Sequence, residues 1–389
     1  MNAFHAYDIR GIWNRDFDKN DVFAIGFFLP ALLKTDKVLV GRDVRLSSPE
    51  IHAALTAGLV AAGVEVYDVG LATTPMVYYA GAKHGFKASV QITASHNPAE
   101  YNGLKVSEEN ARPVGYANGL GDLEKLLAER KIYPSENPGK VVDFNVKDEY
   151  LSFLKTYRSD YSRLKIAMDL SNGMAALLVK SVLEGENIRY ICDTLDGTFP
   201  VHDPNPLNPE SVKPLQALVK KEACDIGVIF DGDADRVMFT DENGRFISPD
   251  LMIGVLGHYF LENKNMQATV LQDIRTSKAV GEYLSVMGAK MQTWKVGRAF
   301  AARKLREIGG LFGGELAGHY YFRDFFYSDS GILACLIILN VAAAMKDRGV
   351  SVSQLIAGIE KYHNSGEINF RIENKTEAME AVRRHFAEK

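Results

Sequence analysis

The segment at residues 91–105, QITASHNPAEYNGLK, places Ser95 and His96 at the end of a strand-like run. The chain has no Gly-x-Ser-x-Gly nucleophile elbow, so acyl transfer by this serine is disfavoured. A serine can also carry a phosphoryl group, provided that positive charge neutralises the phosphate. His96, Lys105 and Arg236 are candidates for that charge. Judged alone, the segment fits a turn or helix cap equally well, because Ser, Asn and Pro are common there.

A second candidate is DGDADR, where an apolar run at residues 226–230 leads into Asp231, Asp233 and Asp235. Carboxylates this close repel one another unless a cation neutralises them, and their oxygens suit a hard ion such as Mg²⁺. A solvated acidic turn is the plainer alternative. The spacing to Glu242 matches an EF-hand in part, but the loop's sixth position is Arg rather than Gly. We therefore predict a Mg²⁺ site at the end of a buried strand.

Two further segments carry polar residues that could serve a site. Glu315 and His319 lie in the glycine-flanked turn GELAGH, where a carboxylate could accept two sugar hydroxyls. A polar turn between strands explains that segment equally well. Arg10 stands in YDIRGI, and a lone arginine of this kind is more often a surface residue or a member of an ion pair.

The elements that must position these loops follow one layout three times. An apolar run ending in a polar residue is followed by a helical stretch and then by a second strand. The paired runs lie at residues 37–45 and 63–70, 165–173 and 187–195, and 269–277 and 289–297. Alternating strands and helices predict parallel sheets with ligands at the carboxyl ends of the strands. We expect three similar mixed/parallel-sheet α/β domains around a shared cleft, each contributing one loop.

Pro- and Gly-containing joints divide the chain. We predict a first domain at 1–143 with the Ser95 loop, a second at 144–248 with the aspartate loop, a third at 249–364 with the Glu315 loop, and a remnant at 365–389. The remnant is expected to hold a strand at 367–375 and an amphipathic helix after it. This pair is too small to bury its own core, so it either docks on the third domain or begins a fourth.

The composition is that of an ordinary globular protein, with 47% hydrophobic and 24% charged residues in 389. The net charge of −4 and the lack of a basic tract argue against nucleic-acid or membrane partners. Cys192, Cys224 and Cys335 are far apart in sequence and fit no metal spacing, so we expect reduced thiols in a cytoplasmic protein. The apolar run at residues 331–345 is predicted to be a buried helix rather than a membrane span.

Taken together, YDIRGI, TASHNP with YNGLK, DGDADR and GE-x-x-GH, in this order, resemble the α-D-phosphohexomutase family and its phosphomannomutase/phosphoglucomutase branch. The resemblance runs from about residue 7 to residue 370. It implies four domains around one cleft and a Mg²⁺-dependent enzyme that interconverts hexose 1-phosphate and hexose 6-phosphate. The substrate would be a small phosphosugar of mannose and/or glucose, with a phosphoserine enzyme and a hexose 1,6-bisphosphate as intermediate and activator.

The resemblance also implies roles for individual residues. The catalytic group would comprise Ser95, as the phosphorylated residue, with His96, Arg10, Lys105 and His319. The metal would be bound by Ser95, Asp231, Asp233 and Asp235. Substrate would be bound by Arg236, Arg275, Arg298, Glu315 and Ala317.

This chain departs from the family pattern in ways that affect substrate. Ala317 replaces a serine usual in the family, Arg275 replaces a lysine, and Arg298 replaces a histidine. These changes alter donor geometry and bear on sugar preference rather than on reaction type. The phosphate-gripping loop of the fourth domain is not found, so we expect this chain to turn over poorly. The alternatives are a phosphoglucosamine mutase and a non-catalytic phosphosugar-binding protein.

Overall fold

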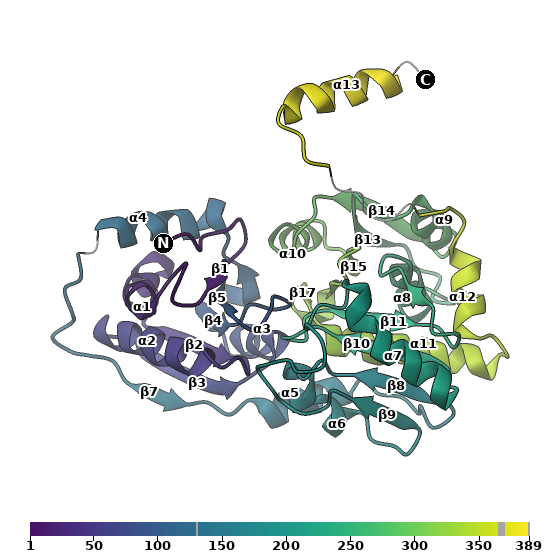
Figure 1. The fold of residues 1–389 in the computed structure, drawn as a ribbon, viewed down its shortest axis with the longest axis horizontal. Coiled ribbons are helices and arrows are strands. Elements are labelled where there is room, and N and C mark those ends of the chain that lie inside the picture. The colour runs from purple at the N-terminus through teal and green to yellow at the C-terminus, as the bar shows by residue number, and fades with distance from the viewer. Residues whose placement is uncertain (130, 365–369, 388–389) are drawn as a thin grey trace.

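The computed structural model describes residues 1–129, 131–364 and 370–387. Three β-sheets follow one another along the chain, each packed against helices (Figure 1). The predicted fold class, three α/β domains with mixed sheets, is therefore confirmed. The predicted domain boundaries remain predictions. No helix among the residues that the structure describes is both long and apolar enough to cross a membrane.

The first sheet has seven strands in the order β1-β5-β4-β2-β3-β7, with β6 paired to β5. Its strands are β1 (Ile9–Ile12), β2 (Lys37–Arg42), β3 (Glu65–Leu71), β4 (Ala88–Ile92), β5 (Tyr101–Glu108), β6 (Arg112–Pro113) and β7 (Val141–Asp143). The neighbouring helices are α1 (Lys19–Leu33), α2 (Ser48–Ala61), α3 (Thr74–Lys83) and α4 (Leu120–Glu129), with 3₁₀ turns at Glu109–Ala111 and Tyr116–Asn118. Strand β5 runs antiparallel to both β1 and β4. The carboxyl ends of β1 and β4 therefore lie beside the amino end of β5, at the same edge of the sheet.

The second sheet has five strands in the order β12-β11-β10-β8-β9. They are β8 (Ile166–Asp169), β9 (Ile188–Ile191), β10 (Ile226–Phe230), β11 (Val237–Thr240) and β12 (Phe246–Ile247). The helices are α5 (Lys147–Lys155), α6 (Val179–Val182) and α7 (Pro209–Glu222), with a 3₁₀ turn at Met174–Leu177. Strand β10 is parallel to β8 and antiparallel to β11, so the aspartate loop is the tight connection between β10 and β11.

The third sheet has five strands in the order β14-β13-β15-β16-β17. They are β13 (Ala268–Asp273), β14 (Ala289–Trp294), β15 (Phe312–Gly314), β16 (Tyr320–Phe322) and β17 (Ser328–Asp329). The helices are α8 (Leu251–Phe260), α9 (Lys278–Val286), α10 (Arg298–Glu307), α11 (Gly331–Asp347) and α12 (Val352–Ile359), with a 3₁₀ turn at Arg323–Phe325. The Glu315 turn connects β15 with its antiparallel neighbour β16, as the aspartate loop connects β10 with β11.

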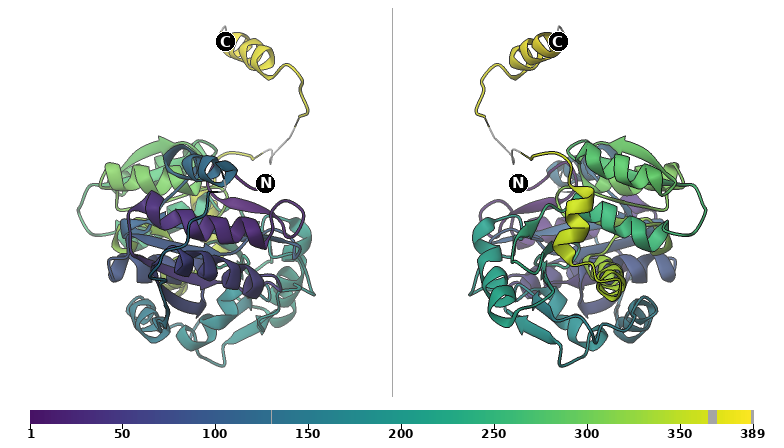
Figure 2. Two further views of the ribbon diagram at one scale, coloured as in Figure 1. Left: turned by 90° about the vertical axis from the view of Figure 1, so that its left-hand side faces the viewer. Right: turned by 90° about the vertical axis from the view of Figure 1, so that its right-hand side faces the viewer.

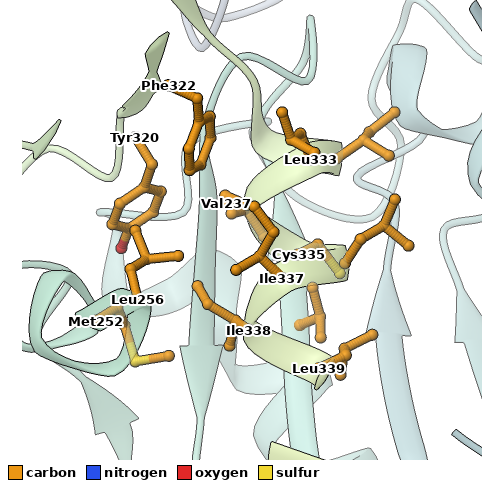
Figure 3. Close-up of a cluster of buried hydrophobic side chains, with 14 of the residues drawn as sticks. Val237, Met252, Leu256, Tyr320, Phe322, Leu333, Cys335, Ile337, Ile338 and Leu339 are labelled. Atoms are coloured by element: carbon orange, nitrogen blue, oxygen red, sulfur yellow. The ribbon is translucent and has the colours of Figure 1, made fainter. Parts of the chain in front are cut away.

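Helix α11 is the buried helix that the apolar run at residues 331–345 predicted. It packs against strand β11 of the second sheet and against helix α8 of the third. Figure 3 shows Val237 of β11, Met252 and Leu256 of α8, and Tyr320 and Phe322 of β16 beside it. Its residues Leu333, Cys335 and Ile337 are fully buried. The helix is therefore shared between two domains, and one hydrophobic cluster runs through both of them.

The C-terminal helix α13 (Lys375–Ala387) stands apart from the body of the molecule (Figures 1 and 2). None of its side chains is buried, so the structure does not show it docked on the third domain. The predicted strand at 367–375 is not formed at residues 370–374, and residues 365–369 lie outside the described part of the chain. The predicted helix is confirmed.

Two glycines let α1 and α2 approach closely. A Cβ on Gly58 would lie 2.0 Å from the carbonyl oxygen of Phe23, and one on Gly26 would lie 2.3 Å from that of Leu55. Glycine disfavours a helix by about 1 kcal/mol relative to alanine. The close contact between the two helix backbones explains why glycine nevertheless stands at both positions.

We expect Gly58→Ala to lower the free energy of unfolding by about 2 kcal/mol, because the added methyl group meets a backbone oxygen. The matched control is Gly358→Ala in α12, where a Cβ would meet nothing within 4 Å. That variant should be stabilised by up to about 1 kcal/mol. Urea unfolding of both variants measures the difference, and equal effects would contradict the close-packing argument.

Candidate active site

The three predicted loops converge on one cavity of about 800 Å³. Residues of all three domains line it, which fits the expected shared cleft. The predicted site residues in its lining are Arg10, Ser95, His96, Lys105, Asp235, Arg236, Arg275, Arg298, Glu315, Ala317 and His319. The other two, Asp231 and Asp233, are fully buried just beneath it and contact Ser95 and Lys105. The structure thus brings every predicted site residue together.

Ser95 lies in the connection between β4 and β5 and is only 3% exposed. Its hydroxyl donates to Oδ2 of Asp231 at 2.9 Å and lies 3.4 Å from Nη2 of Arg236. Its backbone has a φ of 53°, in the left-handed region that is uncommon for residues other than glycine. Gly232 makes the approach of the two loops possible, since a Cβ there would lie 2.4 Å from the carbonyl oxygen of Ser95.

The three aspartates form a compact, fully buried group in which one carboxylate oxygen of each lies within 4.8 Å of one oxygen of each of the others. Nζ of Lys105 lies 2.6 Å from Oδ2 of Asp233 and 2.5 Å from Oδ2 of Asp235. The remaining oxygens, Oδ1 of Asp233 and Oδ1 of Asp235, are buried without a hydrogen-bond partner among the residues that the structure describes. Buried carboxylate oxygens without donors are suitable ligands for a hard cation, so this group fits the predicted Mg²⁺ site.

The three aspartates differ in the direction in which their pKa values are shifted. Burial, followed by the charges of Asp235 and Asp233, raises the pKa of Asp231 to about 7. Burial acts in the same direction on Asp233 and Asp235, but the ammonium of Lys105 outweighs it and lowers the pKa of both. Burial alone would lower the pKa of Lys105, but the charges of Asp233 and Asp235 outweigh it and raise this pKa. Lys105 and the aspartates therefore stabilise each other's charged forms.

Three of the four predicted basic residues, Arg10, Lys105 and Arg236, place positive charge around Ser95. Burial and the charges of Arg236 and Arg10 lower the pKa of His96, which favours its neutral form. Arg236 pairs with Asp231 at 2.9 Å, and Arg10 pairs with Asp8 and donates to Asn97 at 2.8 Å. Arg10, Lys105 and Arg236 thus supply the charge, while Nδ1 of His96 lies 3.4 Å from the Ser95 hydroxyl.

Arg45 is a site residue that the sequence reasoning missed. It is 1% exposed and pairs with Asp43 at 3.2 Å. Its guanidinium donates to four backbone carbonyls of the Ser95 loop, those of Ser95, Asn97, Pro98 and Tyr101, at 2.6–3.1 Å. No local pattern predicts this role, because the loop lies some 50 residues further along the chain. Arg45 therefore fixes the backbone that presents the serine.

The wall from the third domain carries Glu315 and His319. Glu315 is 2% exposed and accepts the hydroxyl of Tyr321 at 2.9 Å, and burial raises its pKa. Nδ1 of His319 lies 2.6 Å from Oδ2 of Asp329. Burial would lower the pKa of His319, but Asp235 and Asp329 outweigh it and raise the pKa.

The two arginines of this wall are held by neighbouring carboxylates. Arg298 donates to Asp329 at 3.0 Å, and its guanidinium lies 3.9 Å from the ring centroid of Tyr78. Its Nη2 is buried and has no hydrogen-bond partner in the described residues. Arg275 pairs with Asp273 at 2.8 Å. Asp329 thus orients both His319 and Arg298, a role that the sequence did not indicate.

Family models and curated relatives match this chain over most of its length. Models of the phosphoglucomutase/phosphomannomutase α/β/α domains I, II and III match residues 1–120, 148–244 and 248–362. The phosphomannomutase of Methanocaldococcus jannaschii is 35% identical over 99% of this chain and 86% of its own length. The chain belongs to the phosphoglucomutase/phosphomannomutase family. The family and its class of enzyme, the intramolecular phosphotransferases, are confirmed as the motifs predicted.

Solved structures of the family agree with this fold. A phosphoglucomutase/phosphomannomutase family protein from Burkholderia thailandensis superposes with a TM-score of 0.85 at 29% identity, covering 93% of this chain and 80% of that chain. An N-acetylphosphoglucosamine mutase from Aspergillus fumigatus, solved with GlcNAc-6P and magnesium, shares only the fold. Its TM-score is 0.52 at 14% identity, covering 84% of this chain and 66% of its own.

We expect Arg45→Met to lower the free energy of unfolding by about 3–5 kcal/mol, because it leaves Asp43 buried without its partner. Amide exchange at residues 95–101 should also accelerate, since their carbonyls lose their donor. The control is Arg163→Met, which breaks an exposed pair with Asp347 and should cost less than about 1 kcal/mol. Unfolding in urea, with hydrogen exchange read by mass spectrometry, provides both measurements. Unchanged exchange in the Ser95 loop would refute the positioning role.

Glu315→Gln should change how stability depends on pH. Burial raises the folded-state pKa of Glu315. The contribution of this carboxyl group to the free energy of unfolding is therefore fully present below its unfolded-state pKa and is lost as pH rises through its folded-state pKa. Glutamine cannot ionise, so Tm of the variant relative to the parent should increase between about pH 5 and about pH 8. The exposed Glu307→Gln is the control. A Tm difference independent of pH would contradict this assignment.

Proposed function

We propose that this chain is a Mg²⁺-dependent phosphohexomutase that interconverts the 1-phosphate and 6-phosphate of mannose and/or glucose through a phosphorylated Ser95. The observation that carries the proposal is the placement of the Ser95 hydroxyl. It lies 2.9 Å from Asp231 and 3.4 Å from Arg236, in a cavity that also holds Glu315 and His319. A buried serine between a metal-type carboxylate and a guanidinium suits phosphoryl transfer.

The metal site in this proposal consists of Ser95, Asp231, Asp233 and Asp235. Their fit rests on the compact carboxylate group and on the two buried oxygens without donors. When bound, Mg²⁺ would offset the negative charge of the phosphoserine and make its phosphorus more electrophilic. The magnesium in the Aspergillus fumigatus structure supports this choice of ion through a shared fold.

In the first half-reaction, the 6-hydroxyl of a hexose 1-phosphate attacks the phosphorus on Ser95. A bond forms from that oxygen to phosphorus, the bond from phosphorus to Oγ of Ser95 breaks, and the serine regains the proton that the sugar loses. Arg10, Lys105 and Arg236 stabilise the charge of the phosphoryl group during transfer. The 1,6-bisphosphate then turns within the cavity and returns its 1-phosphoryl group to Ser95, leaving hexose 6-phosphate.

The wall from the third domain holds the sugar in both orientations. Glu315 accepts sugar hydroxyls, and His319, oriented by Asp329, exchanges a proton through its other ring nitrogen. The unpartnered Nη2 of Arg298 is a donor for the substrate phosphate, and Arg275 is a second one. Ala317 offers no hydroxyl to the sugar, so recognition there depends on Glu315. The low exposure of Ser95 limits hydrolysis of its phosphoryl group by water.

We expect glucose 1,6-bisphosphate with Mg²⁺ to place one phosphoryl group on Ser95, detected by intact mass and peptide mapping. EDTA should prevent the transfer, because three buried carboxylates would then repel the phosphate. Ser95→Ala should accept none and should lose at least about 10³-fold of any mutase activity. Cys224→Ser, a substitution far from the cavity, should behave like the parent.

The same experiment separates the alternatives. Ligand binding without phosphoryl transfer would contradict the proposal and favour a phosphosugar-binding protein. Phosphorylation of Ser95 followed by turnover of mannose or glucose 1-phosphate would support it. A preference for glucosamine 1-phosphate over both would instead indicate a phosphoglucosamine mutase.

A further inference from the structure

A second group of side chains of the types that bind metals lies outside the cavity, at the carboxyl end of the second sheet. Asp169 ends strand β8, Cys192 follows strand β9, and His202 lies in the loop that leads to α7. Nε2 of His202 is 3.0 Å from Oδ2 of Asp169 and 3.7 Å from Sγ of Cys192. One potential ligand atom from each residue falls within 4.8 Å of the other two.

The other polar atoms of these side chains already have partners. Nδ1 of His202 lies 2.8 Å from the carbonyl oxygen of Asp203, which fixes the ring and turns Nε2 toward the cluster. Oδ1 of Asp169 accepts the backbone N–H of Ser171 at 2.8 Å, which leaves Oδ2 for the cluster. Partners of this kind orient ligands in established metal sites. The side chains of Asp169 and His202 are 0% and 7% exposed, so both are well fixed.

The ligand types distinguish this group from the aspartate loop. A thiolate and an imidazole are ligands of Zn²⁺ and similar transition metals, whereas Mg²⁺ prefers oxygen. With bonds of about 2.0–2.3 Å, ligand atoms around a tetrahedral Zn²⁺ lie roughly 3.3–3.8 Å apart. The observed 3.0 Å and 3.7 Å lie close to this range. Three protein ligands would leave one position for water.

We propose that Asp169, Cys192 and His202 form a binding site for one divalent transition metal ion of the Zn²⁺ class. The ion would enter from the surface, because Cys192 lines a hollow of about 430 Å³ together with Val201 and Lys221. Binding would release the protons of the thiol and the imidazole to solvent. The site is separate from the proposed phosphohexomutase activity and does not depend on it.

A metal ion in this site would stabilise the loop from Cys192 to His202, which extends to Arg45 beside the Ser95 loop. The segment from Cys192 to His202 includes Phe199, whose ring lies 5.0 Å from the guanidinium carbon of Arg45. On the other side, Ser171 Oγ donates to the carbonyl of Phe230, the residue before the aspartate loop, at 2.6 Å. A metal ion here would therefore stabilise the connection between the second domain and the Ser95 loop.

The sequence could not reveal this group, because its members are separated by 10 and 33 residues and match no metal-binding motif. Without an ion, the same residues form an ion pair between His202 and Asp169 beside a thiol. The alternative is that this ion pair and the neighbouring thiol bind no metal ion.

The test is titration of the full chain with Co²⁺ in excess Mg²⁺, followed by near-ultraviolet absorption. A thiolate bound to Co²⁺ gives a charge-transfer band, whereas the oxygen ligands of the aspartate loop do not. We expect one equivalent of this band in the parent chain and in Cys224→Ser. It should fall to background in Cys192→Ser, and His202→Gln should weaken binding at least tenfold.

Zn²⁺ provides an independent measurement. It should displace Co²⁺ and raise Tm of the parent and of Cys224→Ser, but not of Cys192→Ser. Circular dichroism without metal checks that each variant is folded. A parent chain without the band, or a band that persists in Cys192→Ser, would overturn the proposal and leave the ion pair as the explanation of the cluster.

Discussion

Neutralisation of the buried aspartate loop is the constraint on which the rest of the site depends. Three carboxylates with no exposed surface would destabilise the fold unless cations accompany them. Lys105 from β5 and Arg236 from the loop itself supply that charge. Because Lys105 belongs to the first domain and the aspartates to the second, the same contacts that neutralise the loop also join the two domains.

The loop backbone extends this connection to all three domains. The carbonyl of Asp233 accepts the N–H of Thr74 at the start of α3, and that of Ala234 accepts the N–H of Gly331 at the start of α11. Arg236 and His319 form an isolated β-bridge that links the aspartate loop to the Glu315 turn. The aspartate loop is therefore fixed relative to α3, α11 and the Glu315 turn by main-chain bonds as well as by charge.

The sequence predicted those parts that depend on local patterns. Strand runs ending in polar residues gave the three α/β domains, and the four motifs gave the residues that line the cavity. Contacts between distant segments were not predictable in this way. Arg45 meets the Ser95 loop, Asp329 meets His319 and Arg298, and Cys192 meets His202 only once the chain has folded. His96 illustrates the same limit, because its pKa is lowered by burial and by cations that other segments bring near it.

Helix α11 shows that the second and third domains do not have separate hydrophobic cores. The three domains resemble copies of one layout, yet α11 contributes side chains to the core of the second as well as the third (Figure 3). Excision of either domain would leave Leu333 or Val237 facing water and would remove buried apolar contacts worth several kcal/mol in sum. The second and third domains thus share one core, so neither can be exchanged without loss of packing in the other.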